Sequence, residues 1–324
     1  MEEYAYTDSG VLRTIPNLAG VTETLTRNIE GGLEEHTVQS RAHTWSETIE
    51  LMLNGLPRRV RTADTAGVAP AFDRTFVYDE MLRIQDVSRT FSSASGTRQF
   101  HLHLDYQQNR IAGRTEQLPN ESAASHYDYR YRGQEPTQLT ELLRNGRSAQ
   151  TFAYDQKGTE TRDGTATAST DAQGRIYRKG NTHYVHDAGG NISHMFDAST
   201  GRIYARAGLV DITYVLGESG EFVRSQTERL VGSARIEVGT GQVRFVHRDF
   251  QNSPVLAYQN AETIQFQRNA YTEFGKSLVS QITLPTDGFQ GGWKDLGSDT
   301  VFFGIAPYNP NTLLRANPDP VWSN

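Results

Sequence analysis

A short turn pattern recurs along this chain of 324 residues and constrains its fold more than any other feature. A strand-like stretch ending in an aromatic residue is followed by Asp, two or three spacers, Gly and a new strand-like stretch. The clear copies are FAYDQKG (152–158), STDAQGRIY (169–177), YVHDAGGNI (184–192) and MFDASTGRIY (195–204). Asp bonds backbone amides of a tight turn, and Gly supplies its positive φ. The pattern therefore predicts antiparallel β-hairpins, with turns at Asp171–Gly174, Asp187–Gly190 and Asp197–Gly201.

Weaker copies of the turn pattern extend the hairpins toward the N-terminus. They read AYTDSGVL (5–12), FVYDEMLRI (76–84) and LDYQQNRIA (104–112). In four copies an Arg-Ile pair follows the turn, at Arg83-Ile84, Arg110-Ile111, Arg175-Ile176 and Arg202-Ile203. A polar residue followed by an apolar one begins the alternation of a new strand. A chain of successive hairpins is the predicted arrangement.

Two further hairpins are predicted around Asn-Gly pairs. The segments are 47–62, with Asn54-Gly55 at its turn, and 138–154, with Asn145-Gly146. Both contain good helix formers, so short helices are the alternative. Alternation of Ile49, Leu51 and Leu53 on one face, and the Asn-Gly turns themselves, favour strands.

The composition agrees with a thin sheet. Hydrophobic residues make up only 36% of the chain and the mean hydropathy is -0.60, so a thick two-sided core is not expected. The 15 Tyr and 14 Phe supply burial instead, because aromatic side chains pair well across strands. Polar tracts at 62–71, 92–98 and 113–125 are predicted to be loops.

Charge, cysteine content and hydropathy exclude several classes of protein. The net charge of -6 arises from interspersed charges, without a basic block for nucleic acid. The absence of Cys excludes disulfides and thiolate metal sites. No apolar run approaches the roughly 20 residues of a membrane span. The polar start MEEYAYTDSG lacks the features of a signal peptide, so export is expected to use another route or a signal on a longer precursor or a partner chain.

The stretch from Val246 to Pro320 carries a second signal, in three blocks. The first block, VHRDFQNSPVLAY, contributes His247, Asp249, Ser253 and Pro254, and the second, AYTEFG, contributes Tyr271, Phe274 and Gly275. The third contributes Gly288, Phe289, Gly291, Asp295, Phe303, Gly304, Tyr308, Pro310, Pro318, Asp319 and Pro320. Their spacing resembles the C-terminal core of Rhs proteins, the YD-repeat family that includes Tc-toxin C subunits and animal teneurins.

The resemblance implies an all-β fold in which antiparallel hairpins form a spiral strip and the core seals one end of a hollow shell. We expect the strip over 1–240 and the Rhs-core-like segment over 241–324, continuous with each other. The three-block residues are interpreted as structural. A propeller or sandwich is the alternative, but the units are shorter and less regular than a propeller requires. The implied function is a structural shell segment of a toxin-encapsulating or surface-displayed assembly, secreted or at the cell surface.

Partners are expected at the N-terminal edge. Strands near Tyr4–Tyr6 and Ile15 have only Glu2, Glu3 and Pro16 to discourage pairing, and unpaired sheet edges must be covered or joined. We therefore expect association with another YD-repeat polypeptide or with a second copy, and a toxin as possible cargo. Prolines are expected to block the C-terminal end.

Catalysis is not expected, although the resembled family suggests one candidate. Toxin members carry an aspartyl autoprotease, and Asp319 matches one of its aspartates. A proton-sharing pair needs two carboxylates. Asn309 stands where the family has the other Asp, Trp322 replaces a Gly, and the chain ends before the usual cleavage position. Asp319 is interpreted as a turn residue.

Metal and cofactor sites are not predicted. Three histidines lie close in sequence, but His183 and His186 fall on opposite faces of a strand, and His194 is left as a surface residue. Carboxylate pairs at Asp295/Asp299 and Asp187/Asp197 are interpreted as turn residues, since neither has the spacing of a calcium loop. No phosphate-binding or nucleophile motif is present, and no cofactor is expected.

Aromatic residues leave a second function class open. Trp45, Trp293 and Trp322, with the tyrosines, are candidates for sugar-stacking platforms. Cross-strand packing is the commoner role of aromatic residues in sheets. A cell-surface adhesion or carbohydrate-binding module is therefore the alternative function, with glycans as partners.

Overall fold

The fold is all-β. The computed structural model describes the chain apart from residues 1–4, 7–11, 17–20, 41–42, 66–70, 94–95, 119–120, 133–137, 157, 165, 260–266, 283, 285, 296–299, 304–305 and 316–324. The described residues contain no α-helix, and one 3₁₀ turn, η1 (Phe289–Gly291), interrupts the strands. None of their helical segments is long and apolar enough to cross a membrane. The predicted fold class is confirmed.

The chain forms two compact units. One comprises Met1–Tyr129 with Leu143–Arg147, and the other Arg130–Leu142 with Ser148–Asn324. The first unit holds β1 (Ala5–Tyr6), β2 (Leu12–Pro16), β3 (Thr22–Arg27), β4 (Leu33–Gln39), β5 (Thr44–Leu51), β6 (Pro57–Asp64), β7 (Ala71–Tyr78), β8 (Ile84–Ser93), β9 (Gly96–Gln107) and β10 (Arg110–Glu116). Three strands contain residues of both units: β11 (Ser125–Tyr131), β12 (Leu139–Arg144) and β13 (Arg147–Tyr154).

The second unit holds the remaining strands. They are β14 (Glu160–Asp163), β15 (Ala166–Thr170), β16 (Ile176–Lys179), β17 (Thr182–His186), β18 (Ile192–Asp197), β19 (Arg202–Ala207), β20 (Val210–Leu216), β21 (Phe222–Val231), β22 (Ala234–Glu237), β23 (Val243–Arg248), β24 (Pro254–Gln259), β25 (Gln267–Tyr271) and β26 (Ser277–Ser280). A separate small sheet follows, of β27 (Trp293–Lys294), β28 (Val301–Phe303), β29 (Ala306–Asn309) and β30 (Leu314–Arg315).

Each strand pairs antiparallel with the next one in sequence. In the first unit this holds from β1 to β11. In the second it holds from β13 to β26. The strip is thus a succession of hairpins. The division proposed at 240/241 falls between β22 and β23, which pair directly, so the strip runs across it without a break.

One turn geometry joins many of these strands and confirms the predicted turns. At Asp171 the backbone N–H donates to the carbonyl of Arg175, and Gly174 N–H donates back to Asp171, both at 3.0 Å. Gly174 has a φ of 81°. The Asp171 carboxylate accepts the N–H groups of Gln173 and Arg175, at 2.9 Å each. The same backbone pair recurs at Asp187, and Asp197 caps its own turn through Ser199. Asp is therefore required because one oxygen satisfies two turn amides.

At two of these turns the Arg of the Arg-Ile pair adds a contact to the Asp carboxylate. Arg175 Nε donates to the second oxygen of Asp171 at 2.7 Å, and Arg83 does the same to Asp79. Burial would raise the pKa of the Asp171 carboxyl, but the hydrogen bonds from Arg175 and the turn amides outweigh it and lower the pKa. The Ile that follows enters the strand facing the core, as the 2% exposure of Ile176 shows.

The Asn-Gly segments are strands joined by tight turns, not helices. Asn145 and Gly146 both have positive φ, as a type I′ hairpin turn requires, and β12 and β13 flank them. In the other segment Gly55 has a φ of 80° between β5 and β6. The placement of Leu53 with Ile49 on one face was wrong, because Leu53 lies in the turn and is fully exposed.

The predicted loops were too long. Strand β6 runs to Asp64, β9 begins at Gly96, and β10 runs to Glu116. The polar tract at 113–116 is strand because its charged side chains face inward and pair. Arg89 and Glu116 lie 3.3 Å apart, and Arg114 lies 3.8 Å from the same carboxylate, all of them buried. Polarity indicated a loop here, whereas buried ion pairs allow a strand.

The first unit buries a row of apolar and aromatic side chains along its strands. Its buried members include Val38, Trp45, Ile49, Val60, Phe76, Val87, Phe100, Leu102, Leu104 and Ile111. Trp45 packs edge-on against His36 at 5.3 Å, and His36 Nε2 lies 2.7 Å from a Glu23 carboxylate oxygen. The expected cross-strand aromatic packing is therefore present.

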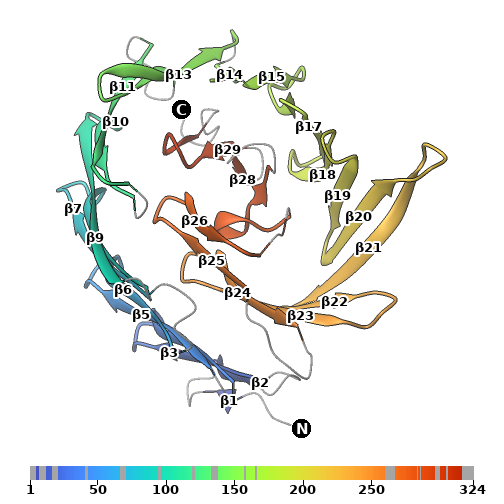
Figure 1. Cartoon of the computed structure of the whole chain (residues 1–324), viewed down its shortest axis with the longest axis horizontal. Coiled ribbons are helices and arrows are strands. Elements are labelled where there is room, and N and C mark those ends of the chain that lie inside the picture. The colour runs from blue at the N-terminus through green and yellow to red at the C-terminus, as the bar shows by residue number, and fades with distance from the viewer. Residues whose placement is uncertain are drawn as a thin grey trace. The chain divides into compact units, whose positions relative to one another are not determined.

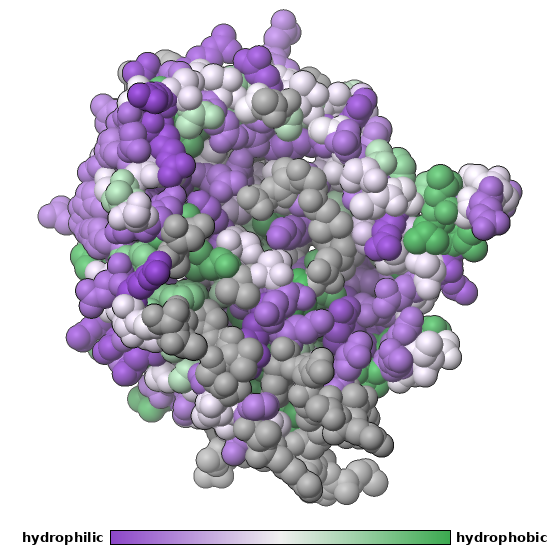
Figure 2. Space-filling model, in the orientation of Figure 1, coloured by the Kyte–Doolittle hydropathy of each residue, from purple (hydrophilic) through white to green (hydrophobic). Residues whose placement is uncertain are grey.

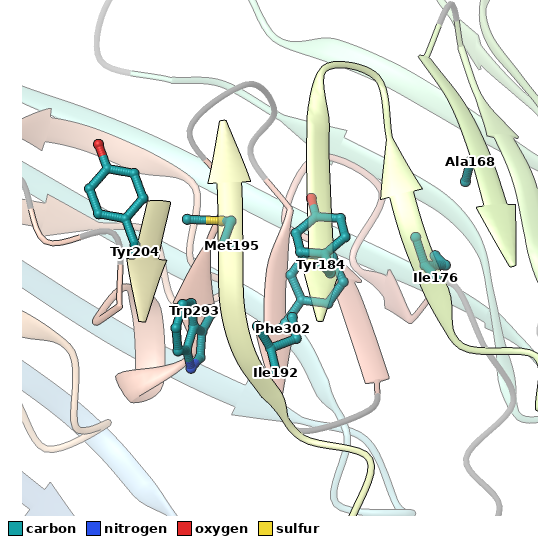
Figure 3. Close-up of a cluster of buried hydrophobic side chains, with 8 residues drawn as sticks. All are labelled: Ala168, Ile176, Tyr184, Ile192, Met195, Tyr204, Trp293 and Phe302. Atoms are coloured by element: carbon teal, nitrogen blue, oxygen red, sulfur yellow. The ribbon is translucent and has the colours of Figure 1, made fainter. Parts of the chain in front are cut away.

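In the second unit the strip curves, and the C-terminal segment, meaning the described part of residues 281–315, lies on its concave side (Figure 1). A buried apolar cluster joins the two. Ala168, Ile176, Tyr184, Ile192, Met195 and Tyr204 come from β15–β19, and Trp293 and Phe302 from β27 and β28. Figure 3 shows Phe302 against Tyr184, their rings 4.6 Å apart. Burial of aromatic area therefore fixes the small sheet to the strip.

Candidate functional site

The first motif block forms the hairpin turn already seen in the repeats. Asp249 sits at the turn after β23, and its carboxylate accepts the N–H groups of Gln251 at 3.0 Å and Ser253 at 2.8 Å. Asn252 holds the positive φ, 66°, that Gly holds elsewhere. The Ser253 hydroxyl accepts the backbone N–H of Gln290 in η1 at 3.0 Å. The block thus ties the strip to the C-terminal segment.

Residues of the second block pack against η1. Gly275 has a φ of 84°, and a Cβ there would lie 2.4 Å from the Phe289 ring, so only Gly allows this approach. Phe289 packs with Tyr271 and Tyr308 at ring distances of 5.9 and 6.5 Å. The Tyr308 hydroxyl donates to the carbonyl of Phe274 at 2.8 Å. Tyr271, Phe289 and Val301 thus form a buried cluster, against which Tyr308 and Phe303 pack.

His247 and Asp295 are buried and contact residues of the strip. His247 is 1% exposed and stacks on Tyr258, with Nε2 3.3 Å from the tyrosine hydroxyl. Asp295 is 1% exposed and accepts the Thr182 hydroxyl at 2.8 Å. Burial beside this carboxyl raises the pKa of Tyr184. Asp295 therefore anchors the segment to β17.

A first charged cluster, here called the lysine clamp, holds the small sheet. It consists of Glu160 and Asp163 of β14, Lys179 of β16, Thr300 and Asn309. Lys179 is 2% exposed, and its ammonium donates to Asp163 at 2.8 Å, Thr300 at 3.1 Å and Glu160 at 3.3 Å. Two buried carboxylates therefore share one ammonium.

The burial of two carboxylates beside a single ammonium shifts the pKa of Glu160. Burial raises the pKa of its carboxyl to about 7; attraction to Lys179 opposes the rise, and the negative charge of Asp163 adds to it. Burial would lower the pKa of Lys179, but the two carboxylates outweigh it and raise that pKa. Glu160 is thus the group of this cluster whose charge changes near neutral pH.

Asn309 completes the lysine clamp. Its amide Nδ2 donates to Asp163 at 2.9 Å, and its Oδ1 accepts the backbone N–H of Asn311 at 2.9 Å. Gln150 also donates to Asp163. An amide fits where a carboxylate would face Asp163, so the residue that departs from the family pattern is matched to its surroundings.

A second cluster, here called the arginine clamp, sits on β19–β23. Asp211 and Glu228 are directly opposite on β20 and β21, and Arg235 and Arg244 on β22 and β23. Each like-charged pair would be unfavourable alone. Arg235 bridges Asp211 at 2.8 Å and Glu228 at 3.1 Å, and Arg244 reaches Glu228 at 2.9 Å. Arg206 adds a two-point contact to Asp211, at 2.6 and 2.9 Å.

The arginine clamp also binds side chains of the C-terminal segment. The second guanidinium nitrogen of Arg235 donates to Asp287 at 2.9 Å, and Arg248 donates to both oxygens of the same carboxylate. The Thr286 hydroxyl donates to Asp211 at 2.7 Å. Charge-assisted bonds of this kind are about twice as strong as neutral ones. The clamp therefore fixes residues 286–287 to the strip.

The remaining candidates hold simple positions. His183 packs beside Phe196 at 5.9 Å, and exposed His194 bonds Ser193 at 3.0 Å. Burial and the charge of Arg175 lower the pKa of His186. Pro254 and Pro310 are buried, and Gly291 has a φ of 74°, which favours Gly. Gly288 lies beside the 3₁₀ turn and Phe303 packs on Tyr308 at 6.0 Å.

Some predicted positions lie outside the described residues. They are Glu2, Glu3, Tyr4, Asp299, Gly304, Pro318, Asp319, Pro320 and Trp322. The autoprotease candidate Asp319 and the outermost N-terminal edge remain predictions.

Sequence reasoning missed both clamps. Glu160, Lys179 and Arg235 carry no motif, and charged residues in a polar chain suggest surface. No period-2 pattern marks them either, because Glu160 and Asp163, and likewise Ile176 and Lys179, are buried three positions apart.

Solved structures share this fold. The chain matches the crystal structure of TcdB2–TccC3–TEV with a TM-score of 0.59 at 11% identity, over 98% of this chain and 20% of that chain. It matches a Photorhabdus luminescens Tc holotoxin pore with mutated TccC3 at a TM-score of 0.58 and 11% identity, over 99% and 20%. It matches TcdB2–TccC3 without the hypervariable C-terminal region at 0.58 and 10%, over 98% and 20%.

The chain spans about a fifth of the length of the solved chains that it matches. No protein-family profile and no curated protein matches its sequence. The comparisons therefore bear on the architecture of the chain.

Proposed function

We propose, from this Rhs/YD-repeat-like fold, that the chain is a structural wall segment of a shell that encloses a toxin or is displayed at the cell surface. Its C-terminal segment acts as the plug on the concave side. The observation that carries the proposal is the fastening of that segment by two charged clamps and two aromatic clusters within the second unit. A secreted or cell-surface location belongs to the same proposal.

The matched structures support the toxin association. They are structures of TcdB2 with TccC3, one of them a Tc holotoxin pore. Because this chain spans about a fifth of their length, a complete shell requires further strands from elsewhere. We propose that another YD-repeat polypeptide or a second copy supplies them, joined at β1, the first strand of the described strip.

The role is proposed to be non-catalytic. The Asn309 amide is engaged on both sides, and an amide does not exchange a proton as a paired carboxylate does. Trp45 and Trp293 are buried, so neither offers a platform for a sugar ring.

Light scattering tests the assembly. Two samples are measured: the chain alone, at concentrations up to the high micromolar range, and the chain mixed with a YD-repeat polypeptide from the same organism. At least one is expected to give a mass above 36.2 kDa. Deleting residues 1–20 should abolish the association while circular dichroism stays β. A strictly monomeric chain under both conditions would reject the proposal.

A matched control concerns the β20–β21 hairpin, where apolar side chains gather in Figure 2. Leu216 and Phe222 oppose each other there and are 55% and 43% exposed. Replacing both with Ser should leave the association unchanged. If it is lost instead, the hairpin is the joining surface and the N-terminal edge is not.

A further inference from the structure

A half-open cavity of about 240 Å³ lies beside the arginine clamp, on the concave face of the strip. Strands β19–β23 and the C-terminal segment line it, through Arg202, Tyr204, Asp211, Ile212, Thr213, Gln226, Glu228, Arg235, Arg244, Leu284 and Thr286. Sites for drug-sized molecules are usually larger, about 300–1,000 Å³. The cavity therefore suits a group of the size of one amino-acid residue.

The charges around the cavity are unequal. The lining carries three guanidinium groups, of Arg202, Arg235 and Arg244, and two carboxylates, of Asp211 and Glu228. Arg206, outside the lining, also donates to Asp211, so both carboxylates are already engaged. An excess of positive charge and of N–H donors remains on the lining.

Two arginines hold that excess. The side chain of Arg202 is exposed at the cavity and makes no ion pair or hydrogen bond with any described residue. Arg244 uses one terminal nitrogen on Glu228, while its buried Nε finds no hydrogen-bond partner in the described part of the chain. A buried donor without a partner is costly, so it marks a place for an acceptor.

The same surface already binds one acceptor, the carboxylate of Asp287. Arg235 and Arg248 hold it from the strip, and it arrives on a polypeptide segment packed over the concave face. The planar fork of guanidinium matches a carboxylate with two parallel bonds. Asp287 therefore shows which ligand chemistry this row of arginines accepts.

We infer that the cavity binds a second carboxylate, the acidic side chain of a polypeptide enclosed by the wall, between Arg202 and Arg244. The inference deepens the proposed function, because the concave face of a wall segment is the face that meets an enclosed chain. Gln226 and Thr213 line the same cavity and offer polar groups to the backbone of that residue.

Calorimetric titration of the full chain tests this, with the capped peptide acetyl-Glu-Glu-Glu-amide as the probe. Binding in the millimolar range or tighter is expected at low salt, weakening as salt screens the charges. Arg202→Ala should weaken it about tenfold, the scale of one charge-assisted contact. Arg202→Lys should restore part of the affinity.

Arg224→Ala is the matched control, because Arg224 is exposed on β21 opposite Tyr214 and does not line the cavity. It removes the same charge and should leave binding unchanged. The peptide acetyl-Gln-Gln-Gln-amide, which lacks the carboxylates, should not bind. Inorganic phosphate and glucuronate, which carry negative charge without a peptide backbone, should bind more weakly than the glutamate peptide.

Equal binding by the Gln peptide, phosphate or glucuronate, or unchanged affinity in Arg202→Ala, would overturn the inference. These outcomes are separate from the proposed function, since the light-scattering mass does not depend on them. If the chain is strictly monomeric but still binds the glutamate peptide at Arg202, the proposed role as a wall segment is rejected and the carboxylate site is retained.

Discussion

Replacing Glu160 with Gln should remove a pH dependence of stability from the lysine clamp. Glu160 is 4% exposed and shares one ammonium with Asp163. Gln has the shape of a protonated Glu and retains an oxygen for Lys179. The variant therefore compares a permanently neutral group with one that titrates.

The magnitude follows from the pKa. Burial raises the pKa of Glu160 from its ordinary 4.5 to about 7. That difference corresponds to roughly 3 kcal/mol between the two protonation states. Because the folded-state pKa is the higher one, the stabilisation is fully present below pH 4.5 and is lost as the pH rises through 7.

Urea unfolding at pH 5 and pH 8 measures the effect. In a background with Trp45 and Trp322 replaced by Phe, the fluorescence of Trp293 reports on the cluster that joins the small sheet to the strip. From pH 5 to pH 8 the free energy of unfolding of the parent should fall by up to about 3 kcal/mol more than that of Glu160→Gln.

The two proteins should be nearly equal in stability at pH 5, where the folded parent carries a protonated Glu160. Parallel stability profiles for parent and variant across pH 5–8 would show that Glu160 titrates as an ordinary exposed carboxyl, and the lysine clamp would be described wrongly.

Three further predictions follow from the same contacts. Asn309→Asp should lower the free energy of unfolding by about 1–3 kcal/mol at pH 8, because it places a second carboxylate beside Asp163. In the same urea assay at pH 4 the stability of this variant should return toward that of the parent. Arg235→Met should cost about 3–5 kcal/mol, since it leaves buried carboxylates such as Asp287 without their shared cation; a loss below 1 kcal/mol by urea unfolding would contradict this. Intact-mass spectrometry over days at pH 5 and 7 should find an uncut chain, and a C-terminal cut abolished by Asp319→Asn would establish the autoprotease.

The hairpin architecture was predictable because it rests on local chemistry. The carboxylate of Asp171 satisfies two turn amides and Gly174 supplies the positive φ, and both signals are visible within five residues. The first motif block was predictable for the same reason, since Asp249 and Asn252 form that turn again.

The inward-facing charges were not predictable with the same reasoning. Glu116 and Lys179 read as surface residues, yet they are buried because partners from other strands neutralise them. Thr300 reaches Lys179 across 121 positions of sequence, and no local pattern encodes such a contact. Glu116 follows buried Arg114 by two positions, as alternation along β10 requires, whereas Lys179 is buried three positions after Ile176 and does not alternate with it.

The pairing of like charges explains why the arginine clamp was also missed. Asp211 opposite Glu228 is unfavourable for two adjacent strands considered alone. The pairing of Asp211 with Glu228 is stabilised because Arg235 of β22 binds Asp211, and Arg235 in turn binds Asp287 of the C-terminal segment. Two-strand rules therefore fail where a third and a fourth element complete the contact.

Electron cryomicroscopy of the tagged chain, purified from its native source with whatever it carries, tests the central claim most directly. The account predicts a particle in which strands of another polypeptide or another copy continue the strip beyond β1 and surround an enclosed space, with the C-terminal segment on the concave side. An isolated 36.2 kDa chain without added strands, or one whose C-terminal segment is displaced from β14–β24, would contradict it.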